Sequence, residues 1–247
     1  LHGFAHYTQK LSNRTTFKMG LNADLYDLIY QDSVRKVNGR DGTVYPWRVQ
    51  WDTRAQWAVV QPYASLRSNL TPRLSLTAGW TATYSNVNAN SISLVEPRLG
   101  LNYKQSRNTN FFAGTGIHSQ MQSAYLYYYA IGNNGRDPGE HNTDMGLTKS
   151  YHSVAGVEHR LSSLPMRVKA EVYYQYLWNI PVERLKMDAN PLSASFGQRV
   201  VGSSFSMVNA GSGFGRLWPD TLENTGTGRN FGLELTAEDF FTKGFYG

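Results

Sequence analysis

The stretch MRVKAEVYYQY, residues 166–176, carries the pattern that decides the fold. Every second residue from Met166 to Tyr176 is apolar or aromatic, whereas the residues between them begin with Arg167, Lys169 and Glu171. Successive side chains of a β-strand point to opposite faces of a sheet, so this alternation predicts a strand with one apolar and one polar face. Taken alone, the stretch also fits a soluble β-sandwich, in which the charged face would meet water.

The same alternation recurs along the chain, at residues 17–26, 74–84, 95–104 and 233–238. Several of these runs reach about ten residues. A strand of a soluble protein averages about five or six residues, while a tilted strand that crosses a membrane needs about 9–11. Strand length therefore favours a membrane barrel over a sandwich.

The connections between the runs alternate in length. Short polar turns fall near residues 12–14, 69–72, 106–108 and 162–165, and longer linkers fall near 31–46, 85–92, 130–147 and 179–228. Outer-membrane barrels have short periplasmic turns and long extracellular loops. We therefore predict an all-β chain, an antiparallel transmembrane β-barrel segment of about nine or ten strands that forms an open, curved sheet. No helix longer than a turn or two is expected.

Composition narrows the function classes. The 247 residues carry 24 Lys+Arg and 18 Asp+Glu, a net charge of +6, and the scattered charges form no tract for nucleic acid. The absence of cysteine excludes thiol catalysis, disulfides and cysteine-ligated metals within these residues. The mean hydropathy is −0.46, and no window approaches the ~20 apolar residues of a spanning helix. A barrel needs no such window, because only alternate residues meet lipid.

Aromatic residues make up 13% of the chain and predict girdles at the two membrane–water interfaces. Packing inside a soluble sheet is the alternative for these rings. The residues assigned to the girdles are Trp47, Trp51, Trp57, Tyr125, Tyr127, Tyr128 and Trp178.

The two ends of the chain predict that it is one part of a larger protein. It begins at Leu1 without an initiator methionine or a signal peptide, and it ends at Gly247 just after a turn-like segment. We expect residues 1–247 to form a partial outer-membrane β-barrel domain, without its remaining strands or a plug domain.

Five stretches add a family resemblance. They read EPRLGLNY at 96–103, GIHSQMQ at 116–122, YQYLWNIPVE at 174–183, FSMVN at 205–209 and NTGTGRNFGLEL at 224–235. In this order they resemble barrel strands of TonB-dependent outer-membrane receptors, especially the large Bacteroidetes group. The resemblance implies an importer of the outer membrane, built as a barrel of roughly 22 strands with a plug in its lumen.

The resemblance also implies partners. They are outer-membrane lipid, the plug domain of the full-length protein, a TonB-type energising partner and a surface substrate-binding lipoprotein. No cofactor and no nucleic acid is expected. The imported nutrient is not identified by these residues.

Site candidates follow from the predicted strands. His118, Gln120 and Gln122 share one face of a regular strand, and Glu96 and Arg98 face the lumen from another. We expect these five residues to face a substrate or the plug, with a solvated, hydrogen-bonded wall as the alternative.

No catalytic residue and no metal site is expected. His118 and Ser119 are neighbours in a strand and point to opposite faces, so they cannot form a nucleophile–base pair. The six histidines show no metal-ligand spacing. Two other functions stay open: a small complete barrel enzyme of the protease or lipase type, and a soluble β-sandwich binding module.

Overall fold

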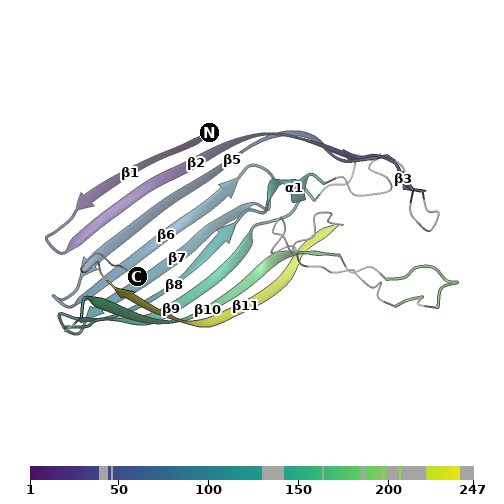
Figure 1. The fold of residues 1–247 in the computed structure, drawn as a ribbon. Helices are drawn as coiled ribbons and strands as arrows, with labels where there is room; N and C mark the ends of the chain where they lie inside the picture. Colours follow the sequence, from purple (N-terminus) through teal and green to yellow (C-terminus); the bar gives the residue numbers. More distant parts are fainter. Residues whose placement is uncertain are drawn as a thin grey trace.

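A computed structural model of the chain contains one nine-stranded antiparallel sheet, which Figure 1 shows as an open, curved wall. The structure describes residues 1–38, 44–45, 47–129, 142–162, 164–184, 187–194, 196–198, 206 and 221–239. The long strands are β1 (His2–Lys10), β2 (Thr15–Val34), β5 (Arg48–Asn69), β6 (Leu74–Ser85), β7 (Ile92–Lys104), β8 (Thr109–Gln120), β9 (Thr148–Arg160), β10 (Met166–Glu183) and β11 (Leu222–Asp239). A small hairpin of β3 (Val37–Asn38) and β4 (Val44–Tyr45) and a one-turn helix α1 (Ala124–Tyr127) complete the described elements.

Each long strand pairs with its neighbours along the chain, in the order β1-β2-β5-β6-β7-β8-β9-β10-β11. The short turns gather at one end of the sheet, and the long connections with α1 gather at the other (Figure 1). These observations confirm the predicted open sheet and its alternating connections. Much of the predicted linkers 130–147 and 179–228, and most of the stretch 205–209, lie outside the described residues.

Strand β11 begins earlier than the sequence predicts. It starts at Leu222, inside the linker expected over 179–228. Its first half is rich in threonine and glycine and lacks an apolar face, which is why alternation does not reveal it.

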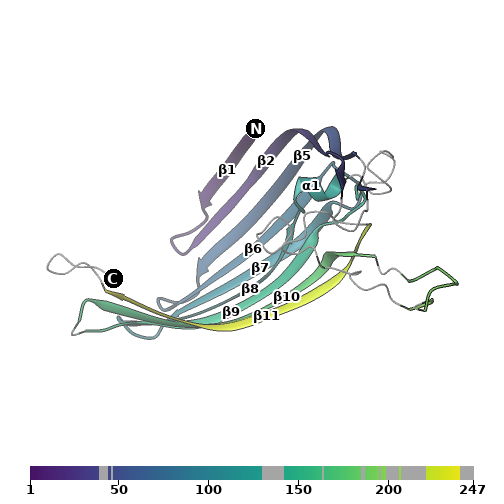
Figure 2. The ribbon, with the colours of Figure 1, turned by 45° about the vertical axis from the view of Figure 1, so that its right-hand side comes forward.

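The two faces of the sheet differ in polarity. One face, called the lumenal face below, carries Lys18, Arg98 and Glu158. The opposite, outward face exposes large apolar side chains such as Leu101, which is 42% exposed, and Val172, which is 55% exposed. Figure 2 shows the wall curving along its whole width. An apolar outward face and a polar lumenal face are the pattern of a barrel that spans a membrane.

Aromatic rings lie across glycines on the lumenal face. Gly20 pairs with Tyr63, Gly156 with Phe112, and Gly232 with Tyr173. A methyl group added to any of these glycines would lie 2.5–2.7 Å from the ring of its partner. Each ring thus covers the backbone of the glycine opposite it. These cross-strand pairs help to fix the register between the two strands.

The compact packing of the described chain lies at the long-connection end. Leu126 and Tyr127 of α1 are completely buried, and they pack with Met145 and Leu222. Three of the predicted girdle residues, Tyr125, Tyr127 and Tyr128, therefore belong to this inner cluster, which corrects their assignment to a lipid interface.

The same correction applies to Trp51 and Trp57, which are both 6% exposed on the lumenal face under α1. Trp51 Nε1 donates to the carbonyl oxygen of Tyr125 at 2.9 Å, and the Trp57 ring lies 6.2 Å from that of Tyr128. We call Trp51, Trp57 and residues 124–128 the aromatic cap. Trp178 instead stacks on Tyr176, two residues away on the same strand face, with centroids 5.8 Å apart.

Asparagine side chains tie the connections of this end together. Asn88 Nδ2 donates to the carbonyl oxygens of Thr143 and Met145, at 2.5 and 2.8 Å. The Asn224 side chain accepts from Gly146 N at 2.8 Å and donates to the carbonyl oxygen of Asn179 at 2.9 Å. Asn179 has a positive φ of 55° at a bulge in β10, a conformation that asparagine tolerates better than most residues.

The described part of the chain contains no helix with the length and hydropathy of a membrane span.

Candidate functional site

A hollow of about 410 Å³ lies on the lumenal side, directly beneath the aromatic cap. Strands β2, β5 and β6 form one side, and the end of β8 with the segment leading to α1 forms the other. We call it the cap hollow. Its lining residues are Asp24, Tyr26, Asp27, Leu28, Trp57, Val59, Gln61, Thr83, Ser119, Gln120, Met121, Gln122 and Ala124.

The aromatic wall of the cap hollow is formed by Tyr26 and Trp57, which pair across β2 and β5. Their rings stack with centroids 5.1 Å apart and an interplanar angle of 12°. Trp57 Nε1 is buried and has no hydrogen-bond partner among the described residues. This N–H is closed off from solvent, so Trp57 lines the hollow with its ring.

The polar wall contains amides and carboxylates. Gln61 Nε2 donates to Thr83 Oγ1 at 3.3 Å. Asp24 Oδ1 lies 2.6 Å from His2 Nδ1, at the first strand of the sheet. Apolar and aromatic surface with a few fixed polar groups is the usual lining of a small-molecule site.

Two of the five predicted site residues line the cap hollow. Gln120 is the last residue of β8, is exposed, and faces the hollow. Gln122 lies beyond the strand end, and its Nε2 donates to Thr148 Oγ1 at the start of β9. The amide of Gln122 is thus fixed by the wall, whereas the amide of Gln120 has no hydrogen-bond partner among the described residues that would compete with a ligand.

The other three predicted residues lie elsewhere on the wall. His118 faces His152 of β9, with ring centroids 6.1 Å apart. Arg98 is exposed and lies over Gly116, where an added methyl group would approach the Arg98 side chain to 3.1 Å. Glu96 is only 2% exposed and accepts a hydrogen bond from Ser119 Oγ. The structure therefore brings together Gln120 and Gln122, but not all five residues.

Sequence reasoning missed Tyr26, Trp57 and Gln61 as parts of this site. The signal was present, since alternate residues counted back from Arg67 through Tyr63 and Gln61 reach Trp57 on the same face. The segment around α1 that covers this site could not be anticipated, because it lies more than 60 residues after Trp57 in the sequence.

The buried tyrosines of the cap hold their protons strongly. Burial raises the pKa of Tyr127, and burial likewise raises the pKa of Tyr128. Removal of water disfavours the charged phenolate. These residues therefore act as neutral packing groups near neutral pH.

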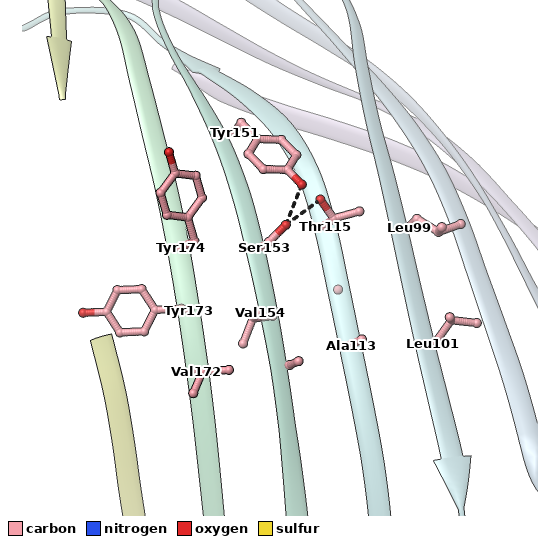
Figure 3. Close-up of a pocket in the computed structure, with 12 residues that line it drawn as sticks. Leu99, Leu101, Ala113, Thr115, Tyr151, Ser153, Val154, Val172, Tyr173 and Tyr174 are labelled. Carbon is pink, nitrogen blue, oxygen red and sulfur yellow. Dashed lines mark hydrogen bonds between the residues drawn. The ribbon is translucent and has the colours of Figure 1, made fainter. Parts of the chain in front are cut away.

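A second hollow, of about 530 Å³, lies on the outward face across β7 to β10 (Figure 3). Small side chains such as Ala113 and Ala155 form its floor, with Leu101 and Val172 at its sides. At one end, Ser153 Oγ donates to Tyr151 OH at 2.7 Å and lies 3.1 Å from Thr115 Oγ1. These hydroxyl groups pair with one another.

The described residues contain no cluster of three or more histidine or acidic side chains that could hold a metal ion.

Comparison with known proteins identifies the fold. No protein-family model matches the chain, and no curated protein is detectably similar to it in sequence. Solved structures do match it. The siderophore receptor PirA from Pseudomonas aeruginosa aligns with a TM-score of 0.59 and 10% identity, over 98% of this chain and 41% of PirA.

Two further structures give the same result. The FrpB iron transporter from Neisseria meningitidis aligns with a TM-score of 0.54 and 13% identity, over 96% of this chain and 32% of FrpB. The copper transporter OprC aligns with a TM-score of 0.58 and 14% identity, over 98% of this chain and 35% of OprC. The chain thus spans about a third to two fifths of the length of these structures. It has the fold of the outer-membrane barrel wall of TonB-dependent receptors.

Proposed function

We propose that residues 1–247 form part of the barrel of a TonB-dependent outer-membrane importer, and that the cap hollow contacts the imported nutrient. The full-length protein would supply further strands, a plug domain that fills the lumen, and contact with an energising partner in the inner membrane. A surface lipoprotein that delivers substrate is a further proposed partner. The nutrient itself stays open.

One observation carries this proposal. The nine strands form a single open sheet with an apolar outward face and a polar lumenal face, and the sheet aligns over nearly its whole length with solved transporters and receptors. PirA is described as a siderophore receptor, and FrpB and OprC as iron and copper transporters. This favours an importer over a small barrel enzyme.

Within the importer, we place substrate contact at Gln120 and at the ring of Trp57. Both lie at the cap hollow, on the side of the sheet where the long connections gather. Long loops of outer-membrane barrels face the outside of the cell, so this end would meet a nutrient first. Glu96 is buried on Ser119 and would act by positioning that residue.

The test is uptake by the native host. A strain that lacks the gene is compared with a complemented strain for uptake of ferric siderophores, copper and a panel of neutral organic nutrients. We expect the deletion to abolish uptake of at least one of them, and a protonophore that collapses the inner-membrane proton gradient to have the same effect. Unchanged uptake in the deletion strain, or uptake that persists without the gradient, would contradict the proposal.

Two variants then locate the site. Trp57→Leu removes the stacked ring, and Trp178→Leu is its matched control on the outward surface. We expect Trp57→Leu to raise the half-saturating nutrient concentration about two- to tenfold, the effect of losing an aromatic contact of about 0.5–1.5 kcal/mol. Equal behaviour of the two variants would exclude the Trp57 ring from the site.

A further inference from the structure

The hollow of about 530 Å³ on the outward face is a trough that runs along β8 and β9 (Figure 3). Small side chains form its floor, and the larger side chains of the flanking strands form its sides. The floor residues are Ala113 and Thr115 of β8 and Ala155 and Ser153 of β9. The side residues are Leu99 and Leu101 of β7 and Val172 and Tyr174 of β10. We call this hollow the outward trough.

The floor of the outward trough offers no hydroxyl hydrogen to a ligand. Thr115 Oγ1 donates to the carbonyl oxygen of His152 at 2.9 Å, and Ser153 Oγ donates to Tyr151 OH at 2.7 Å. The two floor hydroxyls are therefore used within the wall, and the remaining floor is alanine. Such a surface suits a hydrocarbon chain better than a polar ligand.

Two cations lie on the outward face beyond the trough, toward the long connections. Lys149 pairs with Trp178, and Arg229 pairs with Tyr176. The Arg229 guanidinium lies 5.9 Å from the centroid of the Tyr176 ring. Neither cation has an ion-pair partner among the described residues. The outward positions of β8 to β11 between the trough and these cations carry no carboxylate in the described part of the chain.

The aromatic rings beside the cations indicate the level of the lipid headgroups. Tyr176 and Trp178 stack with centroids 5.8 Å apart, between Lys149 on β9 and Arg229 on β11. Tyrosine and tryptophan gather where the hydrocarbon of a membrane meets its headgroups. Only β10 separates the two cations, so their strands are about 10 Å apart. Their long side chains can therefore converge on one headgroup.

The spacing between trough and cations matches one leaflet of a bilayer. Ala155 pairs with Val172 and Lys149 pairs with Trp178, which places six positions between the floor and Lys149 on β9. At about 3.3 Å per residue and a strand tilt of about 40°, this distance rises roughly 15 Å across the membrane. A leaflet contributes half of a hydrocarbon core of about 30 Å. The long connections lie at this end of the sheet, so the leaflet is the outer one.

A second copy of the chain fits this face less well than a lipid does. Two copies related by a twofold axis would present the same patch to each other. Lys149 and Arg229 of one copy would then approach those of the other, and like charges that face each other are unfavourable. A lipid with a neutral headgroup would leave both cations without a partner. An anionic lipid supplies both the chain for the trough and the charge for the cations.

From these observations we infer that the outward trough binds one phosphorylated lipid of the outer leaflet. One acyl chain lies over Ala113 and Ala155, and the phosphate is held by Lys149 and Arg229. The inference goes beyond the proposed function, because it assigns a binding site to the face of the wall opposite the cap hollow. It holds whichever nutrient the importer carries.

The test is native mass spectrometry of the full-length protein in a neutral detergent, titrated with lipid A. Phosphorylated lipid A is compared with lipid A from which the phosphates have been removed, since the two share their acyl chains. The variant Lys149→Gln/Arg229→Gln removes the two cations. Its matched control is Lys104→Gln/Arg107→Gln, which removes two exposed cations at the short-turn end.

We expect the natural protein to bind one phosphorylated lipid A. Each cation near an anionic headgroup is worth about a fivefold change in affinity, so loss of both should weaken binding about 30-fold. The control variant should change it less than about twofold. Equal weakening in the two variants, or equal binding of the dephosphorylated lipid, would overturn the inference. The comparison of the two lipids uses the natural protein, so it decides even where a variant does not fold.

A second pair of variants tests the trough with all cations in place. Ala155→Leu fills the floor, and Ala78→Leu adds the same side chain to the outward face of β6, outside the trough. We expect Ala155→Leu to weaken the binding of phosphorylated lipid A and Ala78→Leu to leave it unchanged. Unchanged binding by Ala155→Leu, or a complex of two copies of the chain without lipid, would contradict the proposed site.

Discussion

Replacing Val172 with arginine tests which face of the sheet meets lipid. Val172 lies on the outward face of β10 and is 55% exposed. It follows Met166, the first residue of the strand, by six positions. At about 3.3 Å per residue and a tilt of about 40°, that places Val172 roughly 15 Å above the short-turn end, near the middle of an apolar band about 25 Å tall.

The expected cost follows from that depth. An arginine on the lipid face of a barrel costs about 2–4 kcal/mol near the bilayer midplane and about 0–1 kcal/mol near an interface. Val172→Arg should therefore lower the folding equilibrium constant by a factor of about 30 to 700. Val154 is the matched control, because it pairs with Tyr173, the next residue of β10, but points to the lumenal face. We expect Val154→Arg to cost less than about 1 kcal/mol, since the lumenal face is polar.

The assay is urea unfolding of the full-length protein refolded into lipid vesicles, with the gel shift between folded barrel and unfolded chain as the readout. The difference between the two variants cancels effects that any new arginine would have. Equal costs, or a larger cost at Val154, would refute the assignment of the outward face.

Three other predictions concern packing within the wall. Gly156→Ala places a methyl group 2.5 Å from the Phe112 ring on the neighbouring strand and should lower the free energy of unfolding by about 1–3 kcal/mol. Gly79→Ala, whose methyl group would meet no atom nearer than 3.6 Å, should leave stability unchanged or raise it by up to about 1 kcal/mol. Equal Tm values for the two variants would contradict the packing of rings over glycines. Asn224→Ala removes the hydrogen bonds that hold the 142–147 segment and should lower the free energy of opening this segment by about 1–3 kcal/mol. Hydrogen exchange of its backbone amides should therefore accelerate, and unchanged exchange rates would contradict the role of Asn224. Burial raises the pKa of Tyr127 above its ordinary value of about 10, so the stability that Tyr127 contributes is complete below pH ~10 and is lost as the pH rises through the folded-state value. Near-ultraviolet circular dichroism should therefore show the aromatic cap opening at a lower pH in the natural protein than in Tyr127→Phe. Coincident titration curves of the two proteins would contradict this prediction.

The wall of the fold was predictable because one physical rule dominates it. Alternation of apolar and polar residues from Met166 places the side chains of β10 up to Leu177, before the bulge, on the faces that the structure shows. The same rule, with connection length, predicted the open sheet and the separation of short and long connections at its two ends. These are local properties, so a single sequence reveals them.

The aromatic cap was mispredicted for the opposite reason. Trp51 and Trp57 fall near a strand end and were assigned to a lipid interface, although alternation counted from Arg67 puts them on the lumenal face. What buries them is the segment around α1, more than 60 residues later, held by asparagine side chains from several connections. Contacts between such distant, irregular segments leave no periodic trace in the sequence.

The candidate site was predictable only in part, for a related reason. Gln120 and Gln122 were selected by strand alternation, but Gln122 reaches the cap hollow after β8 has ended. Glu96 was expected to face the lumen openly, and the structure instead buries its carboxylate on Ser119 from the neighbouring strand. A bulge in β7, seen as a register shift between Thr81 and Thr83 of β6, accompanies this inward turn.

The central claim is that alternate residues of these strands face lipid and lumen, and a spin-label scan of β9 tests it most directly. The 247 residues contain no cysteine, so once any cysteine outside them is replaced, each cysteine introduced from Ser150 to Glu158, leaving out Gly156, labels one position. In the full-length protein in lipid vesicles, we predict that collisions with oxygen peak at residues 151, 153, 155 and 157, and that collisions with a water-soluble nickel chelate peak at 150, 152, 154 and 158. Collision rates without a period of two, or with the two sets exchanged, would contradict the account.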